Sequence, residues 1–386
     1  MSDLLIASIL SGLILIAGTI SVELGIAAAI IEILFGVFAG NVIGIAPTPW
    51  LSFIASFGGI LLTFLAGTEV NLKVMREKFK ASMLIGGASF LAPFIFAFAY
   101  SYYIAGWSLQ ASEIAGIALS TTSLAVVYAV LVETGLTQTE LGKIIMASTF
   151  VTDFGTALAL SVLFLQFNLY TLLFLGFSAV LLIFGPKFIS YFFNRYRNKV
   201  IEPEIKLLFF IFFFSMFLGE IGKSHAVLPI FVLGLLMSRF FEENHALLSK
   251  LRTVAFALIT PFFFIRGGMN VGISEVVSSF NILIALLIIK LIAKIISVYP
   301  LTVAFLPKST KKDKIFFTLL MSTGLTFGTI ASVFGFQSGY LDKTQFSVLI
   351  SVVILSAVVP TIIAQRFFSP LSKTEKEEVL ARGAEH

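Results

Sequence analysis

The carboxylate of Asp153 lies deep within a long apolar stretch of this 386-residue chain. A helix would place it on one face with three hydroxyl side chains, those of Thr149, Thr152 and Thr156. Hard cations prefer oxygen ligands, and by analogy a carboxylate among hydroxyls and water suits a monovalent cation. The same carboxylate can hold a proton, and the remaining alternative is a hydrogen bond that joins two helices. The stripe therefore predicts a shared cation and proton site, or a packing contact.

Three basic residues also fall within apolar stretches: Arg266, Lys290 and Lys294. A charge near the bilayer centre costs about 2.5 to 3.5 kcal/mol, so such side chains usually face a cavity or a partner. The alternative to a role at the site is that one or both of Lys290 and Lys294 extend to a lipid headgroup, which is less favoured for Lys294 because it lies near the middle of its span. For Arg266 we expect a structural ion pair, either with Glu32 or with Glu69.

Two polar, helix-weakening stretches lie in the middle of long apolar runs, at Ser120–Ser123 and Ser322–Gly328. Unwound backbone is tolerated at that depth only where it lines a cavity or is buried in protein. Interrupted helices at corresponding positions in two halves of a chain indicate a transport site near the membrane midplane. We expect the hydroxyls of Thr122 and Ser123 to contribute to ion binding there. The alternative is ordinary packing of small residues between helices.

Composition identifies the elements that must position these residues. The chain is 58% hydrophobic and 12% charged, with a mean hydropathy of +1.02, whereas soluble domains average about 45 to 50% apolar and about 25% charged residues. A water-soluble fold is excluded. The absence of cysteine excludes thiol catalysis and zinc-thiolate sites. Long continuous apolar runs predict an all-α polytopic membrane protein instead of a β-barrel, whose strands alternate in hydropathy.

Apolar runs of about 20 residues, the length that crosses about 30 Å of hydrocarbon, predict thirteen transmembrane spans. Their approximate ranges are 4–20, 23–43, 50–67, 81–104, 112–134, 142–166, 170–193, 204–220, 224–240, 253–273, 279–305, 314–337 and 343–367.

Lysine and arginine gather in alternate loops and in a short charged tail at 371–386. Basic loops remain on the cytoplasmic side of a membrane. This pattern predicts an external N-terminus and a cytoplasmic C-terminus, which requires an odd number of spans. The first span lacks the basic start and the cleavage site of a signal peptide, so we expect it to be retained.

Five short motifs occur in a characteristic order along the chain. They are Ile31-Glu32-Ile33-Leu34-Phe35-Gly36, Phe64-Leu65-Ala66-Gly67-Thr68-Glu69, Thr121-Thr122-Ser123, Phe263-Phe264-Ile265-Arg266-Gly267-Gly268-Met269 and Ala293-Lys294. They resemble, in turn, the G-E-x-x-x-G, F-x-x-G-x-E, unwound T-S, F-F-x-x-x-G-[MV] and G-K motifs of the second cation/proton antiporter family. That family contains NapA-type and GerN-type sodium/proton antiporters and the Kef potassium efflux systems.

The resemblance implies thirteen helices arranged as inverted repeats with two broken crossing helices, and a homodimer. It implies a dimerisation part at about 1–80 and 200–275 and an ion-translocating core at about 81–166 and 279–367. Alternating access by an elevator-like movement of the core is the implied mechanism.

Asp153 takes the position of the family's essential ion-binding aspartate, and Lys294 that of its membrane lysine. The chain departs from the electrogenic members, which have Asp-Asp where this chain has Thr152 followed by Asp153. It also has Gly324-Leu325-Thr326 where the family usually has R-G-E.

We therefore expect a sodium/proton antiporter in the cell membrane of a prokaryote, acting in pH homeostasis, in which Asp153 binds either one proton or one cation. With one carboxylate at the site, exchange should be electroneutral, unless Lys294 or Lys290 releases a proton as the cation enters. Potassium/proton exchange is the alternative, and an ion channel would need a ring of selectivity groups that the sequence does not indicate. No enzymatic activity, cofactor or nucleic-acid partner is expected.

Overall fold

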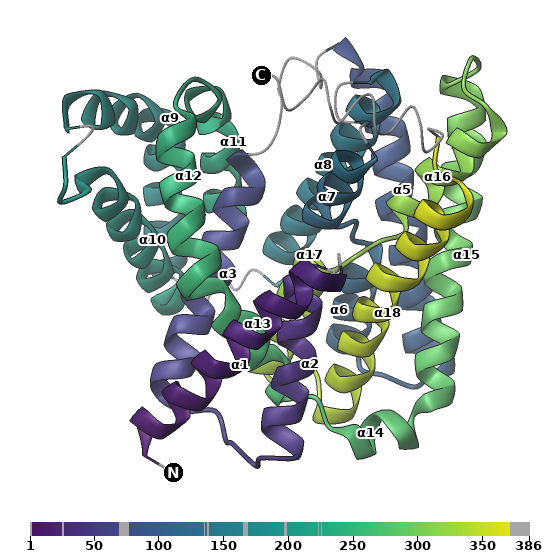
Figure 1. Cartoon of the computed structure of the whole chain (residues 1–386), viewed down its shortest axis with the longest axis horizontal. Helices are drawn as coiled ribbons and strands as arrows, with labels where there is room; N and C mark the ends of the chain where they lie inside the picture. The colour runs from purple at the N-terminus through teal and green to yellow at the C-terminus, as the bar shows by residue number, and fades with distance from the viewer. Residues whose placement is uncertain are drawn as a thin grey trace. The chain divides into compact units, whose positions relative to one another are not determined.

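The computed structural model describes residues 2–24, 27–68, 77–134, 136, 139–164, 169–196, 199–222, 224 and 226–370 (Figure 1). Regular structure within these residues is entirely helical. The chain divides into two compact units, called here the first unit and the second unit. The first unit combines Met1–Leu72 with Ala157–Asn270, and the second unit combines Lys73–Thr156 with Val271–His386.

The first unit is built from helices of both halves of the chain. They are α1 (Asp3–Leu24), α2 (Ala28–Asn41), α3 (Pro49–Thr68), α9 (Leu169–Tyr196), α10 (Pro203–Ile221), α11 (Val227–Glu243), α12 (His245–Val254), the π-helical turn η2 (Ala255–Ile259) and α13 (Thr260–Met269).

Glycines bring two pairs of helices in the first unit into close contact. α2 meets α13 at Gly36 and Gly268, where a Cβ on either glycine would overlap a backbone carbonyl oxygen of the other helix. α3 meets α11 in the same way at Gly67 and Gly234. Only residues without a side chain allow backbones to approach this closely. The first unit therefore contains two tightly joined helix pairs.

The second unit contains the helices that position the candidate site. They are α5 (Phe79–Ala99), the π-helical turn η1 (Tyr100–Ile104), α6 (Leu109–Ser120), α7 (Leu124–Glu133), α8 (Glu140–Leu163, assigned to this unit up to Thr156), α14 (Ile273–Ser278), α15 (Phe280–Phe305), α16 (Lys311–Met321), α17 (Thr326–Gln337) and α18 (Lys343–Phe367).

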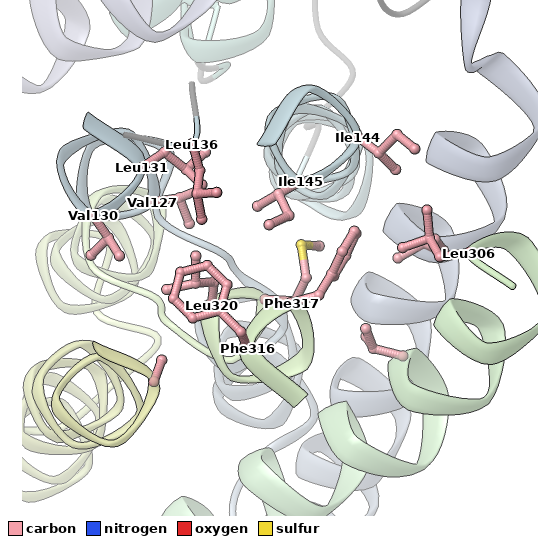
Figure 2. Packing of buried hydrophobic residues seen from close by; sticks show 14 residues of the cluster. Val127, Val130, Leu131, Leu136, Ile144, Ile145, Leu306, Phe316, Phe317 and Leu320 are labelled. Carbon is pink, nitrogen blue, oxygen red and sulfur yellow. The ribbon is translucent and has the colours of Figure 1, made fainter. Parts of the chain in front are cut away.

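The apolar face of α16 packs into a cluster formed by its neighbours (Figure 2). Phe316, Phe317 and Leu320 are fully buried in this cluster. Their partners include Val127, Val130 and Leu131 of α7, Ile144 and Ile145 of α8, and Leu306 at the end of α15. A capping box of Thr310 and Asp313 starts α16. These contacts fix the course of α16 toward its last residue, Met321.

Each of the thirteen expected spans falls on a helix or on consecutive helical segments. Within the described residues, nine helical stretches are at least 18 residues long and apolar enough to cross a membrane, and Ala28–Asn41 is a shorter apolar helix. The predicted all-α, multi-pass membrane architecture is therefore confirmed, while the exact number of crossings stays a prediction.

Both predicted interruptions are present. The fifth expected span stops at Ser120 and resumes at Leu124, and the twelfth stops at Met321 and resumes at Thr326. Each span is therefore a pair of half-helices, α6 with α7 and α16 with α17, joined by a short non-helical segment.

Gly86 and Gly87 are neighbours on α5 with opposite surroundings. A Cβ on Gly86 would lie 2.5 Å from the Ser148 carbonyl oxygen and 2.6 Å from the Val151 Cβ, whereas a Cβ on Gly87 would meet nothing within 4 Å. We expect Gly86→Ala to lower the free energy of unfolding by about 1 to 3 kcal/mol through overpacking. Gly87→Ala is the matched control, because alanine favours a helix over glycine by about 1 kcal/mol. Thermal unfolding in detergent measures the difference, and equal melting temperatures would contradict the close contact between α5 and α8.

Candidate functional site

The two interruptions of the second unit meet each other. The backbone N–H of Ser123 donates a hydrogen bond to the Thr323 carbonyl oxygen at 3.0 Å, and the Thr122 hydroxyl donates to the Met321 carbonyl oxygen at 2.8 Å. The hydroxyls of Ser123 and Thr326 lie 3.4 Å apart. Backbone groups at helix ends lack helical partners, and within a membrane they must find them in the protein. Each interruption thus supplies partners for the other.

Hydroxyl side chains stabilise the points where the two half-helices stop. At the end of α6, the Ser120 and Thr121 hydroxyls donate to carbonyl oxygens three residues earlier, at 2.8 and 3.0 Å. At the end of α16, the Ser322 and Thr323 hydroxyls donate to carbonyl oxygens four and three residues earlier, at 2.9 and 2.7 Å. Serine and threonine offer the backbone alternatives to helical hydrogen bonds. This explains why the chain unwinds at these two polar stretches.

The fully buried Lys294 of α15 binds the end of α6. Its Nζ donates to the Ser120 carbonyl oxygen at 2.7 Å, to the Ser89 hydroxyl at 2.8 Å and to the Thr122 hydroxyl at 3.1 Å. An ammonium group has three donors, so all three are used, and every acceptor is neutral. The carbonyl end of a helix carries partial negative charge. A cation at this position therefore stabilises the interruption.

Lys290, one helical turn before Lys294, is also fully buried. Its Nζ donates to the Ser356 hydroxyl of α18 at 2.9 Å, and that hydroxyl lies 3.4 Å from the Gly324 carbonyl oxygen. The ammonium group therefore does not extend to a lipid headgroup, which was the alternative open from the sequence. It lies beside the interruption between α16 and α17.

Asp153 is buried on α8, with 1% of its surface exposed. The hydroxyl of Thr149, one turn earlier on α8, lies 3.5 Å from the Met321 Sδ at the end of α16. The helix that carries the predicted carboxylate therefore contacts the end of α16. Within the part of the chain that the structure describes, no cluster of three histidine or acidic side chains could hold a metal ion.

Thr152, predicted as a further ion-binding residue, directs its hydroxyl toward the backbone. Its Oγ1 lies 3.1 Å from the Ser148 carbonyl oxygen on α8 and 3.3 Å from the Gly86 carbonyl oxygen on α5. Thr156 likewise donates to the Thr152 carbonyl oxygen at 2.9 Å. The Thr152 proton is engaged in the contact between α8 and α5, so only the lone pairs of its oxygen remain for an ion.

Arg266 belongs to the first unit and has a neutral partner. Its Nε donates to the Ser52 hydroxyl of α3 at 3.2 Å. Glu32 is buried on α2, but within the described residues it forms no ion pair with Arg266, because the guanidinium group extends toward α3 while α2 meets α13 through glycines. Glu69, the other expected partner, lies outside the described residues.

Sequence reasoning missed Ser89 and Ser356, the hydroxyls that accept hydrogen bonds from the two buried lysines. Both lie within apolar helices, where small polar residues also serve ordinary helix packing. Their role depends on which helices become neighbours, so their sequence positions alone carried little signal.

Comparisons with known proteins agree with this architecture. The family model described as "Sodium/hydrogen exchanger, transmembrane" matches residues 9–369. The probable Na(+)/H(+) antiporter 3 of Methanocaldococcus jannaschii is 27% identical over 350 residues, which cover 87% of this chain and 88% of that protein. The Na(+)/H(+)-K(+) antiporter GerN of Bacillus cereus is 22% identical over 374 residues, which cover 94% of this chain and 95% of GerN.

A solved structure has the same fold. The sodium proton antiporter MjNhaP1 from Methanocaldococcus jannaschii superposes with a TM-score of 0.71 at 13% identity, covering 96% of this chain and all of that one. The family resemblance drawn from the motifs is confirmed by the family model that spans nearly the whole chain. The chain belongs to the sodium/hydrogen exchanger family.

Proposed function

We propose that this protein is a secondary active antiporter that exchanges sodium ions for protons by alternating access, with Asp153 as the shared site. The observation that carries the proposal is the position of this carboxylate. It is buried on α8, in the same unit in which Lys294 binds the end of α6 at an interruption. The names of the relatives from Methanocaldococcus jannaschii and Bacillus cereus support sodium as the cation.

Neutralisation of Asp153 couples the transport of sodium ions to the transport of protons. A charged carboxylate without a counter-ion costs several kcal/mol in a low-dielectric interior, so the empty charged form resists movement of the site across the membrane. A bound proton or a bound sodium ion removes that cost. Because both bind the same carboxylate, each passage carries one or the other, and exchange follows.

The charges that change during this cycle predict the stoichiometry. Thr152 stands beside Asp153 where electrogenic relatives have a second carboxylate, and Lys294 is held by three neutral acceptors. Asp153 is then the group that changes its protonation, so one cation exchanges for one proton.

We assign the ion-translocating core to the second unit and the dimerisation part to the first unit, in a homodimer that works by an elevator-like movement. The basic loops support a cytoplasmic C-terminus in a prokaryotic cell, where the exchange would contribute to pH homeostasis. The mechanism uses no cofactor and no enzymatic step.

Potassium is the second candidate cation, because the printed name of GerN includes potassium. Proteoliposomes with an imposed proton gradient distinguish the two cases. Sodium should dissipate the gradient at lower concentration than potassium, and the reverse order would assign the protein to potassium/proton exchange.

We expect Asp153→Asn to abolish cation-dependent proton release in proteoliposomes, because asparagine keeps the shape of the side chain but cannot titrate. Asp342→Asn is the matched control, since Asp342 caps α18 through its side chain and asparagine caps a helix about as well. Both variants should retain the melting temperature of the wild type. Near-normal exchange by Asp153→Asn would rule out the single-site mechanism.

Thr122→Val should reduce exchange because it removes one hydroxyl that serves two groups. That hydroxyl donates to the Met321 carbonyl oxygen and accepts from Lys294, and a buried polar group left without its partner costs about 1 to 3 kcal/mol. Thr122→Ser keeps both hydrogen bonds and should retain activity. Initial exchange rates at several sodium concentrations compare Thr122→Val with Thr122→Ser. Equal kinetics for the two variants would show that the Thr122 hydroxyl plays no part at the site.

Exchange should be insensitive to membrane potential. A net charge moved across the membrane couples to voltage by about 2.3 kcal/mol per 100 mV, so an electrogenic cycle would respond strongly. Sodium-driven proton transport is measured in liposomes with clamped potentials of opposite sign. Equal rates support one-for-one exchange, and a strong voltage dependence would place proton release by a lysine in the cycle.

A further inference from the structure

The ammonium group of Lys290 occupies the space beside Gly324. A Cβ built on Gly324 would overlap the Lys290 Nζ, and it would lie 2.6 Å from the Thr121 Oγ1 and 2.9 Å from the Thr121 carbonyl oxygen. Gly324 belongs to the interruption after α16, and Thr121 to the interruption after α6. The buried charge of Lys290 therefore lies where the two interruptions cross.

One serine connects this ammonium group to the backbone that follows α16. The Ser356 hydroxyl accepts a hydrogen bond from the Lys290 Nζ at 2.9 Å. The same hydroxyl lies within donor distance of two carbonyl oxygens, that of Val353 at 2.9 Å and that of Gly324 at 3.4 Å. Helix α18 thus links the lysine of α15 to the backbone that follows α16.

We propose that Lys290 is a positioning residue of the ion site, which holds the interruption after α16 in place through Ser356. Lys294 holds the carbonyl end of α6 directly, at the Ser120 carbonyl oxygen. Residues four apart lie on one face of a helix, so α15 presents one ammonium group to each interruption. The proposal rests on the function proposed above and assigns it a residue that the single-carboxylate cycle does not use.

The charges explain why two lysines are tolerated so close together. Lys290 and Lys294 are both fully buried one turn apart on α15, and like charges at this spacing repel. The partial negative charges at the ends of α6 and α16, together with the carboxylate of Asp153, offset this repulsion. In this view Lys290 acts by its position at the interruption, and the transported proton is carried by Asp153.

The sign of the effect on sodium affinity separates positioning from simple charge repulsion. Removal of a positive charge near a cation site should tighten sodium binding if charge alone mattered. Loosening of the interruption after α16 would instead displace the Met321 and Thr323 carbonyl oxygens. These oxygens accept hydrogen bonds from Thr122 and Ser123, the two residues predicted to bind the ion. The positioning role therefore predicts weaker sodium binding when the ammonium group is removed.

The test uses the full-length protein in proteoliposomes with three variants. Lys290→Met keeps the length and the apolar stem of the side chain, and we expect it to raise the sodium concentration for half-maximal exchange by about tenfold, which corresponds to about 1.4 kcal/mol. Ser356→Ala should change it in the same direction. Ser351→Ala is the matched control, because Ser351 is another serine of α18 whose hydroxyl donates to a backbone oxygen, at 2.8 Å, and it should leave the value unchanged.

Two further measurements complete the experiment: the charge moved per transport cycle and the melting temperature in the presence of sodium. We expect Lys290→Met to keep the charge moved per cycle of the wild type, and a changed value would make Lys290 a proton carrier and overturn the proposal. Tighter or unchanged sodium binding would overturn it as well, and so would equal effects of Ser356→Ala and Ser351→Ala. If the wild type shows no exchange at all, the proposed function fails, and the sodium-induced rise in melting temperature of the same variants still tests the role of Lys290.

Discussion

Unwound backbone inside a membrane must find its hydrogen-bond partners within the protein, and the second unit is organised around this requirement. Ser123 and Thr122 at one interruption bind carbonyl oxygens of Thr323 and Met321 at the other. Lys294 donates a hydrogen bond to the Ser120 carbonyl oxygen at the end of α6. Polar groups at mid-membrane are thus partners of one another first.

The two buried lysine side chains that the structure describes are held by hydroxyl and carbonyl groups, and no carboxylate is among their hydrogen-bond acceptors. Lys294 uses Ser89, Ser120 and Thr122, and Lys290 uses Ser356. Hydroxyl and carbonyl groups do not titrate near neutral pH. An ion pair between Lys294 and a second carboxylate would have to open when a cation arrives and would couple the lysine proton to the cycle. With Thr152 at that position, turned toward α5, the described part of the chain has no such pair to open.

The parts of the site that the sequence predicts are those in which a polar residue stands out against an apolar stretch. Asp153, the buried lysines and both interruptions are of this kind, and the interruptions lie where the hydroxyl-rich stretches indicate. The sequence could not identify Ser89 and Ser356, because a serine in an apolar helix has many uses and its partner lies more than sixty residues away. Of the two partners expected for Arg266, Glu32 forms no ion pair with it within the described residues, since the Ser52 hydroxyl that Arg266 binds is set by the tertiary packing of α3 and α13. Glu69 lies outside those residues.

The hydrogen bonds of the crossing also limit how access to the site can alternate. Through Lys294, Lys290 and Ser356, helices α5, α6, α15 and α18 are joined to the interruption that follows α16. α8, which carries Asp153, is joined to α5 by the Thr152 hydroxyl and by the close approach at Gly86. A local rotation that exposed Asp153 first to one side and then to the other would break several of these buried bonds, each of which is costly to leave unmade. Movement of the bonded helices as one body preserves them, and this is the physical reason to expect an elevator-like cycle for this chain.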